Sequence, residues 1–293
     1  MVEITFWIKK INLQRIDSYE PHAQSMIENG TWNKKGLAAR ILTFFEGSLA
    51  KKADFLIATT ERFKYEMSNK LNLDVNKIFV KPACVDLDLF SYKNVKNEYL
   101  LKELNLEGKI ICVYAGKFGG IYLGNEVFDL ILEAEKFWGD RFRFLLLTSH
   151  PKEEIELFRQ NSGIGLHTII RKFVKHSEVP NYMGLGDFAL TPVKSVPSKR
   201  FCTPIKDGEY WALGLPIVIT KEISDDSEII ERNAIGYVLK ELTNQEYFNA
   251  VQKIDTFLKG KSRMEIYNKI RPFAEKYRNL QIADGVYQEI YGN

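Results

Sequence analysis

Cysteine is scarce in this sequence of 293 residues, and its distribution excludes two kinds of site. The three cysteines, Cys84, Cys112 and Cys202, are odd in number, far apart and never spaced as C-x-x-C. This pattern argues against a disulfide framework and against a zinc site, and it fits a reducing cytoplasm best. The net charge is only +3, which is too small an excess for a protein dedicated to binding nucleic acid.

Long apolar runs are absent as well. The most apolar stretches, 110–115 and 144–147, are far shorter than the roughly 20 residues that a membrane-spanning helix needs. The opening Met-Val-Glu-Ile-Thr lacks the basic region and apolar segment of a cleavable signal peptide. With 45% hydrophobic and 27% charged residues, the chain has the composition of a globular protein with one large or two ordinary domains. We therefore expect a cytoplasmic protein.

From residue 109 onward, short apolar runs alternate with amphipathic stretches. This alternation predicts an α/β domain whose parallel sheet is covered by helices on both faces. Ligands of such sheets bind outside the carboxyl ends of the strands, so the loops after these runs are the place to seek a site. The predicted strands are 110–115, 142–148, 168–173, 187–191, 216–220 and 236–239.

The first 90 residues contain fewer elements. Strands are predicted at 4–8, 55–59 and 78–81, with helices at 37–51 and 61–71. The polar segment 91–107 is the expected boundary between two domains. No internal repeat and no low-complexity tract is present in the sequence.

The most informative stretch reads Cys-Thr-Pro-Ile-Lys-Asp-Gly-Glu-Tyr-Trp-Ala-Leu-Gly-Leu-Pro from residue 202 to residue 216. Thr203 suits an N-cap and Pro204 suits the first helical position, so a short helix is predicted to begin here. Its free backbone N–H groups, with Lys206 in the first turn, would favour a phosphate. Glu209 lies one turn further on the same face, and its two oxygens match the hydroxyl donors of a ribose. Taken alone, such a lysine and glutamate pair is more often a solvated surface pair.

A second stretch, Tyr-Ala-Gly-Lys-Phe-Gly-Gly at 114–120, ends a predicted strand in a glycine-rich turn that carries Lys117. Gly116 and Gly119 would let the backbone approach a phosphate closely. The spacing matches neither G-x-G-x-x-G nor the P-loop. Together the two stretches predict two phosphate-binding loops at one edge of one sheet.

These residues resemble the retaining GT-B glycosyltransferases of the family-four type, which transfer a sugar from a nucleoside diphosphate donor. The resemblance covers residues 53–293. It includes Ala-Asp-Phe-Leu-Ile-Ala-Thr-Thr at 53–60, Lys-Pro-Ala-Cys-Val-Asp at 81–86, Val-Pro-Asn-Tyr-Met at 179–183 and both stretches described above. It implies a GT-B-like fold of two Rossmann-like domains with parallel sheets, the amino-terminal domain being incomplete.

The resemblance also implies roles for individual residues. Lys117 and Lys206 would contact the diphosphate and act in catalysis, and Glu209 would hold the ribose. Backbone groups at Gly116, Gly119 and Thr203, Pro204 and Ile205 would bind the phosphates without a metal or other cofactor. Two positions depart from the family. Phe201 stands where many members have a first glutamate, and Leu123-Gly124 replaces a Lys-Gly pair, so one phosphate-binding cation is either missing or replaced by Lys199 or Arg200.

The amino-terminal part echoes the family in Asp-Ser-Tyr-Glu-Pro-His at 17–22 and in Glu46. Family members have a histidine or an acid there that faces the sugar, which makes His22 a candidate catalytic residue, although an exposed histidine is the simpler interpretation. Family amino-terminal domains are longer, so this chain is expected to begin partway through its first domain. The predicted division is 1–95, 96–271 and a carboxyl-terminal segment 272–293 that packs back on the amino-terminal domain.

The helix at 37–52 has apolar residues at 37, 41, 44, 45 and 49 and several nearby cations. This pattern favours an ordinary half-buried helix, and the other interpretation is contact with a membrane surface.

The sequence therefore predicts a glycosyltransferase that acts on a nucleotide sugar and a glycan or lipid-linked acceptor in surface polysaccharide synthesis. It would be cytoplasmic, with peripheral contact to the inner face of the membrane as an option. Two alternatives stay open. One is a non-catalytic nucleotide-sugar binding module or truncated remnant. The other is a sugar-nucleotide 2-epimerase, for which Glu20 and His22 are the only obvious acid and histidine pair.

Overall fold

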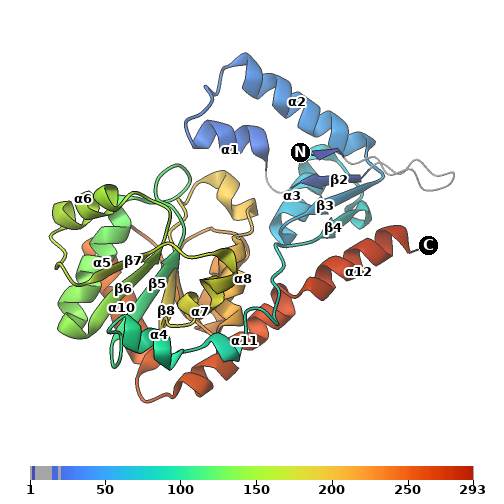
Figure 1. Cartoon of the computed structure of the whole chain (residues 1–293). Helices are drawn as coiled ribbons and strands as arrows, with labels where there is room; N and C mark the ends of the chain where they lie inside the picture. Colours follow the sequence, from blue (N-terminus) through green and yellow to red (C-terminus); the bar gives the residue numbers. More distant parts are fainter. Residues whose placement is uncertain (1, 4–14, 19–20, 293) are drawn as a thin grey trace.

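The larger sheet lies in the carboxyl-terminal half of the chain (Figure 1). In this computed structural model, which describes residues 2–3, 15–18 and 21–292, all six of its strands are parallel. Their order is β10-β9-β8-β5-β6-β7. They are β5 (Ile110–Ala115), β6 (Phe142–Leu147), β7 (Ile169–Lys172), β8 (Phe188–Thr191), β9 (Ile217–Thr220) and β10 (Gly236–Leu239). The six strands predicted from residue 109 onward are confirmed.

Helices cover both faces of this sheet, as the apolar strand runs predicted. Alternate residues of β5 show why: Ile111 and Val113 belong to one apolar core, whereas Cys112 and Tyr114 belong to the other. A strand buried on both faces has no polar side, which explains its unbroken apolar run. The helices are α4 (Glu98–Glu103), α5 (Asn125–Trp138), α6 (Lys152–Ser162), α7 (Val179–Met183), α8 (Ile205–Ala212), α9 (Asp226–Asn233), α10 (Asn244–Leu258) and α11 (Arg263–Tyr277).

The smaller sheet belongs to the amino-terminal half. Its order is β1-β2-β3-β4, and β2, β3 and β4 are parallel, whereas the short edge strand β1 is antiparallel to β2. The strand β2 is an unpredicted element, and the strand predicted at 4–8 lies outside the described residues. The elements are β1 (Val2–Glu3), β2 (Arg15–Ser18), β3 (Phe55–Ala58), β4 (Ile78–Val80), α1 (His22–Glu28), α2 (Leu37–Lys52) and α3 (Glu61–Leu71).

The interpretation of α2 as an ordinary half-buried helix is wrong. Its buried residues are Ala39 and Ala50, and the larger apolar side chains face outward. Phe44 is 69% exposed, and Leu37, Ile41 and Phe45 are exposed as well. The physical reason is that α2 is held mainly by its contact with α1 and by its small residues, so the apolar stripe finds no cover within the described residues.

Two stretches of backbone join the halves and run side by side. The backbone N–H of Val85, after β4, donates to the carbonyl of Arg278, 2.7 Å away, and Val85 pairs with Asn279 in a parallel bridge. Beyond Asn279, the helix α12 (Leu280–Tyr291) lies against the amino-terminal half, where Lys81 stands over the ring of Tyr287. The boundary predicted at residue 272 falls inside α11, and the chain turns only at Arg278 and Asn279 (Figure 1).

The guanidinium of Arg271 on α11 connects three separate carbonyl groups near this crossing. It donates to the oxygens of Phe90 (2.7 Å), Ala212 (2.9 Å) and Leu87 (3.0 Å). Replacing it by methionine leaves these acceptors without their donor. We expect Arg271→Met to lower the free energy of unfolding by about 2–4 kcal/mol in urea denaturation.

The control for that experiment is Arg141→Met, because Arg141 is exposed at the end of a short 3-10 helix. A surface change of this kind is expected to shift stability by less than about 0.5 kcal/mol. Equal effects of the two substitutions would contradict the anchoring role of Arg271.

Candidate functional site

The centre of the carboxyl-terminal sheet contains a topological switch point. The chain runs from β5 outward to β6 and β7, and then returns to the opposite side of β5 to form β8, β9 and β10. The loops after β5 and β8 therefore leave the sheet in opposite directions and open a crevice at its carboxyl edge, where ligands of such sheets bind. Both stretches singled out in the sequence follow these two strands.

The loop after β5 is fixed by hydrogen bonds from its neighbours. The hydroxyl of Tyr114 donates to the carbonyl of Lys117 at 2.6 Å, and the N–H of Phe118 donates to Nε2 of His150 at 2.8 Å. Gly119 has φ +80°, a conformation that favours glycine, and a Cβ there would meet open space. The loop is thus held in place while the side chain of Lys117 remains exposed.

The helix α8 begins one residue later than predicted, with Pro204 and not Thr203 as its N-cap. The hydroxyl of Thr203 is used elsewhere: it accepts hydrogen bonds from the N–H of Ala83 at 3.0 Å and from the guanidinium of Arg278. Ile205, the first helical residue, is exposed, so the start of α8 is open to solvent. Thr203 connects the two halves instead of capping the helix.

Lys206 and Glu209 face one another across the first turn of α8. Nζ of Lys206 lies 2.8 Å from Oε2 of Glu209. The glutamate side chain is 4% exposed and the lysine side chain 34% exposed, so the carboxylate is enclosed and the ammonium has a solvent-facing side. A buried carboxylate is stable only when it is paired, and Lys206 supplies that partner here.

Tyr210 brings α8 against the end of β5. Its hydroxyl accepts a hydrogen bond from the N–H of Ala115, 3.1 Å away, just before Gly116. Complete burial raises the pKa of Tyr210 well above its ordinary value, so this hydroxyl stays neutral. The glycine-rich loop and the helix that carries Lys206 and Glu209 are therefore neighbours, as the sequence predicted from their places on the sheet.

His22 lies at the start of α1 on the amino-terminal half. Its ring is exposed and stands edge-on to Trp32, with 6.4 Å between centroids. Among the described residues, no hydrogen bond or ring contact joins it to Lys117 or to Lys206. The helix itself does approach the site, because the N–H of Ser198 donates to Glu28 at 2.9 Å. Glu20, the other member of the acid and histidine pair, lies outside the described residues.

Glu46 on α2 contacts the backbone at the start of α1. Its Oε1 accepts a hydrogen bond from the N–H of Ala23 at 3.1 Å. Burial raises the pKa of Glu46 above its ordinary value, although this hydrogen bond opposes the shift. In the described structure, Glu46 therefore binds the backbone at the start of α1.

The two residues expected to supply a second cation already have protein partners. Lys199 is buried in the 3-10 helix η5 (Pro197–Phe201), and its Nζ donates to the hydroxyl of Ser25 at 2.9 Å. Arg200 forms an ion pair with Glu222 at 2.9 Å. In this arrangement both side chains hold the protein together. Within residues 2–3, 15–18 and 21–292, no group of three or more His, Cys, Asp or Glu is placed to hold a metal ion.

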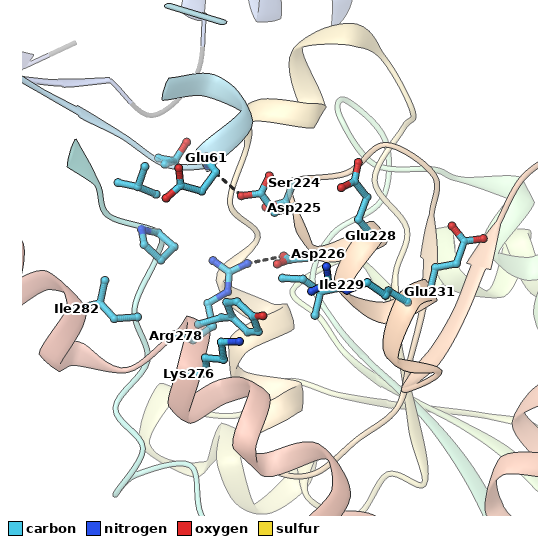
Figure 2. A pocket seen from close by; sticks show the side chains of 15 residues that line it. Glu61, Ser224, Asp225, Asp226, Glu228, Ile229, Glu231, Lys276, Arg278 and Ile282 are labelled. Atoms are coloured by element: carbon cyan, nitrogen blue, oxygen red, sulfur yellow. Dashed lines mark hydrogen bonds and ion pairs between the residues drawn. The ribbon is translucent and has the colours of Figure 1, made fainter. Parts of the chain in front are cut away.

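A pocket of about 730 Å³, which the sequence did not predict, lies between the two halves (Figure 2). Residues at and after the ends of β3 and β4, from α9 and the loop before it, and around the junction of α11 and α12 line it, and none of the predicted donor-binding residues is among them. Figure 2 shows Arg278 directed at Asp226, and the N–H of Glu61 bound to Asp225.

Comparison with solved structures relates this fold to glycosyltransferases. WaaG, a glycosyltransferase involved in lipopolysaccharide biosynthesis, aligns with a TM-score of 0.72 at 14% identity over 95% of this chain and 75% of WaaG. Alr3699/HepE of Anabaena, in complex with UDP, has a TM-score of 0.72 at 12% identity over 95% of this chain and 72% of its own. The pneumococcal O-GlcNAc transferase GtfA, in complex with UDP and GlcNAc, has a TM-score of 0.60 at 15% identity over 85% and 47%.

No profile of a known protein family matches the sequence, and no curated protein does either. The likeness is therefore one of structure. The chain has the GT-B fold of glycosyltransferases, with two α/β units of mainly parallel sheets, and the predicted fold class is confirmed.

The contact between Tyr210 and Ala115 can be removed with little change of shape. Tyr210→Phe leaves the buried N–H of Ala115 without an acceptor, and we expect a loss of about 1–3 kcal/mol in the free energy of unfolding. Tyr65→Phe is the matched control, since Tyr65 is exposed on α3. If urea denaturation shows the same stability for both variants, the hydrogen bond does not hold α8 against β5.

Proposed function

We propose that this protein is a glycosyltransferase that takes a sugar from a nucleoside diphosphate donor and transfers it to a glycan or lipid-linked acceptor in surface polysaccharide synthesis. The observation that carries this proposal is the position of Lys117, Lys206 and Glu209. All three lie in the two segments that flank the switch point of a GT-B fold. UDP in the complexes of Alr3699/HepE and GtfA supports a nucleotide ligand of this kind.

In the proposed mechanism, the diphosphate group is the leaving group, and negative charge grows on it as the glycosidic bond breaks. Lys117 after β5, Lys206 in α8 and the open N-terminus of α8 are the positive groups that would stabilise this charge. We propose that they do so without a metal ion. The backbone of Gly116 and Gly119 and of Thr203, Pro204 and Ile205 would contact the phosphates, and Glu209 would exchange its bond with Lys206 for the ribose hydroxyls.

We propose that the acceptor binds to the amino-terminal half and that His22 faces the transferred sugar. The transfer is proposed to retain the configuration at the anomeric carbon. The division into an amino-terminal domain 1–95 and a nucleotide-binding domain from residue 96 belongs to this proposal, with the carboxyl-terminal limit moved from residue 272 to the turn at Arg278 and Asn279. A binding module without catalysis is the competing function, and it is distinguished by measuring turnover separately from nucleotide affinity.

Nucleotide binding is the first test. Calorimetry is expected to show that UDP binds both with and without EDTA. Glu209→Gln is expected to weaken binding by about 1–3 kcal/mol, because the ribose loses a charged acceptor. Lys253→Ala, an exposed change on α10, is the control and keeps the wild-type affinity. Equal affinity of wild type and Glu209→Gln would contradict the role of Glu209, and loss of binding in EDTA would contradict the metal-free mechanism.

Turnover is the second test, with hydrolysis of a UDP-sugar as a readout that needs no acceptor. Lys206 would face charge that grows in the transition state, so Lys206→Ala is expected to lower kcat by about 100- to 1000-fold at saturating donor. Glu209→Gln would act mainly on KM, because the ribose does not change during the reaction. Binding of UDP without any hydrolysis or transfer would favour the binding module.

We also propose that α2 places the protein on the inner face of a membrane. Phe44 and Phe45 are exposed on this helix beside Leu37 and Ile41. The cations around them, Lys34, Lys35, Arg40, Lys51 and Lys52, are exposed, and the only acid of the helix, Glu46, is turned toward α1. An apolar stripe flanked by cations matches an anionic lipid surface. No helix of the described residues has the length and apolar character to cross a bilayer.

Co-sedimentation with vesicles tests this contact. The wild type is expected to bind vesicles rich in phosphatidylglycerol and not vesicles of phosphatidylcholine alone. The double change Phe44→Ser with Phe45→Ser is expected to weaken binding at least about tenfold, because each buried phenyl ring contributes about 1.5–3 kcal/mol. Phe173→Ser removes an equally exposed ring from the loop after β7 and serves as the control. Unchanged binding of the double variant would rule out α2 as the contact.

A further inference from the structure

A buried row of polar side chains runs from α8 to the place where the chain crosses between the halves. Asp207, next to Lys206, is fully buried, and its Oδ1 accepts a hydrogen bond from the hydroxyl of Thr191 at the end of β8. Asp226 begins α9 and forms an ion pair with Arg278. The side chains of that pair are 3% and 2% exposed, so solvent does not screen their charges.

The two carboxyl groups share too few donors for both to be ionised. Oδ2 of Asp207 is buried and has no hydrogen-bond donor within the described part of the chain. The carboxyl group of Asp226, which is itself an acceptor, is adjacent and raises the pKa of Asp207. A hydrogen bond between them requires a proton on one of the two. Because Arg278 supplies a single positive charge to the cluster, one neutral and one ionised carboxyl group give a balanced site.

The guanidinium of Arg278 continues the row toward the amino-terminal half. It also donates to the hydroxyl of Thr203, which accepts the N–H of Ala83, while the carbonyl of Arg278 accepts the N–H of Val85. Packing is equally close, since a Cβ on Gly208 would lie 2.7 Å from Cγ2 of Val85 and 2.9 Å from Cγ of Arg278. The first turn of α8 therefore cannot shift without displacing the crossing segment.

We propose that Asp207 is a positioning residue that works as a neutral acid. It donates its proton to Asp226 and thereby fixes the turn that carries Lys206 and Glu209 relative to Arg278 and the crossing segment. The positioning of a nucleotide rests on the proposed function, whereas the shared proton does not.

Other titratable groups near Asp207 do not account for this proton. Asp226 comes from α9, Arg278 from the turn after α11, Tyr210 from α8 itself and Tyr122 from the loop after β5. Burial raises the pKa of both tyrosines, so both stay neutral at any pH below the ordinary pKa of a tyrosine. Burial and the adjacent Asp226 carboxylate raise the pKa of Asp207 well above its ordinary value.

Infrared spectroscopy tests the proton directly. At pH 7 the wild type is expected to show the band of a protonated carboxylic acid. Asp207→Asn keeps an acceptor for Thr191 and a donor for Asp226 but has no carboxyl group, so the band disappears. Asp74→Asn, an exposed control, retains it. A wild type without the band, or an Asp207→Asn variant with an unchanged band, overturns the neutral acid.

The pH dependence of unfolding gives a second measure. Above the ordinary pKa of an aspartate, the folded wild type holds one proton that the unfolded chain has released, so its stability falls as pH rises. Between pH 5 and 8 the unfolding constant of the wild type is expected to increase by up to about tenfold per pH unit relative to that of Asp207→Asn. Parallel curves for the two proteins overturn the neutral acid.

Nucleotide affinity tests the positioning role, with UDP as the probe and circular dichroism to confirm that each variant is folded. Asp207→Asn is expected to bind within about twofold of the wild type, and Asp207→Ala at least about tenfold more weakly, because it loses both hydrogen bonds. Equal binding by a folded Asp207→Ala overturns the positioning role. A wild type that binds no UDP overturns the proposed function and the positioning role together, and the infrared and pH measurements then still decide the shared proton.

Discussion

Arg278 connects three separate parts of the chain at one point: the start of α9, the residue before α8 and the segment after β4. The guanidinium binds Asp226 at the start of α9 and Thr203 before α8, and the carbonyl accepts the N–H of Val85 from the amino-terminal half. A buried guanidinium is costly unless its donors are paired, so its partners are constrained as strictly as the arginine itself. The start of α8, the start of α9 and the segment after β4 are therefore held together at this one residue.

Much of the carboxyl-terminal half could be predicted because a strand that is buried on both faces is apolar along its whole length, and this is easily recognised in the sequence. Strands such as β5 and β6 are continuous apolar runs, and the helices between them alternate regularly, so their order along the chain was readable. The strand β2 was missed because Arg-Ile-Asp-Ser has no apolar pattern and is a strand only through its pairing with β3. The exposure of α2 was also missed, since periodicity shows which side is apolar and not whether anything covers it.

The candidate site divides in the same way. Lys206 and Glu209 are three residues apart, and local helix geometry was enough to put them on one face. Gly116 and Lys117 were placed near α8 by the rule for the carboxyl edge of a parallel sheet. The capping role of Thr203 was wrong because its hydroxyl is taken by Ala83 and Arg278, which are remote in sequence. Contacts at such separations, including those of Asp207 and Asp226, cannot be derived from one sequence without its fold.

The paired backbones at Val85 and Asn279 also determine how the molecule can move. The halves are linked by two covalent tethers that run side by side, and a hydrogen bond joins the tethers themselves. Two adjacent tethers limit separation of the halves and leave rotation about the line on which they lie. Contacts away from this line, between Lys199 and Ser25 and between Glu61 and Asp225, restrict that rotation as well. A protease that cut one tether would leave the halves joined through the other.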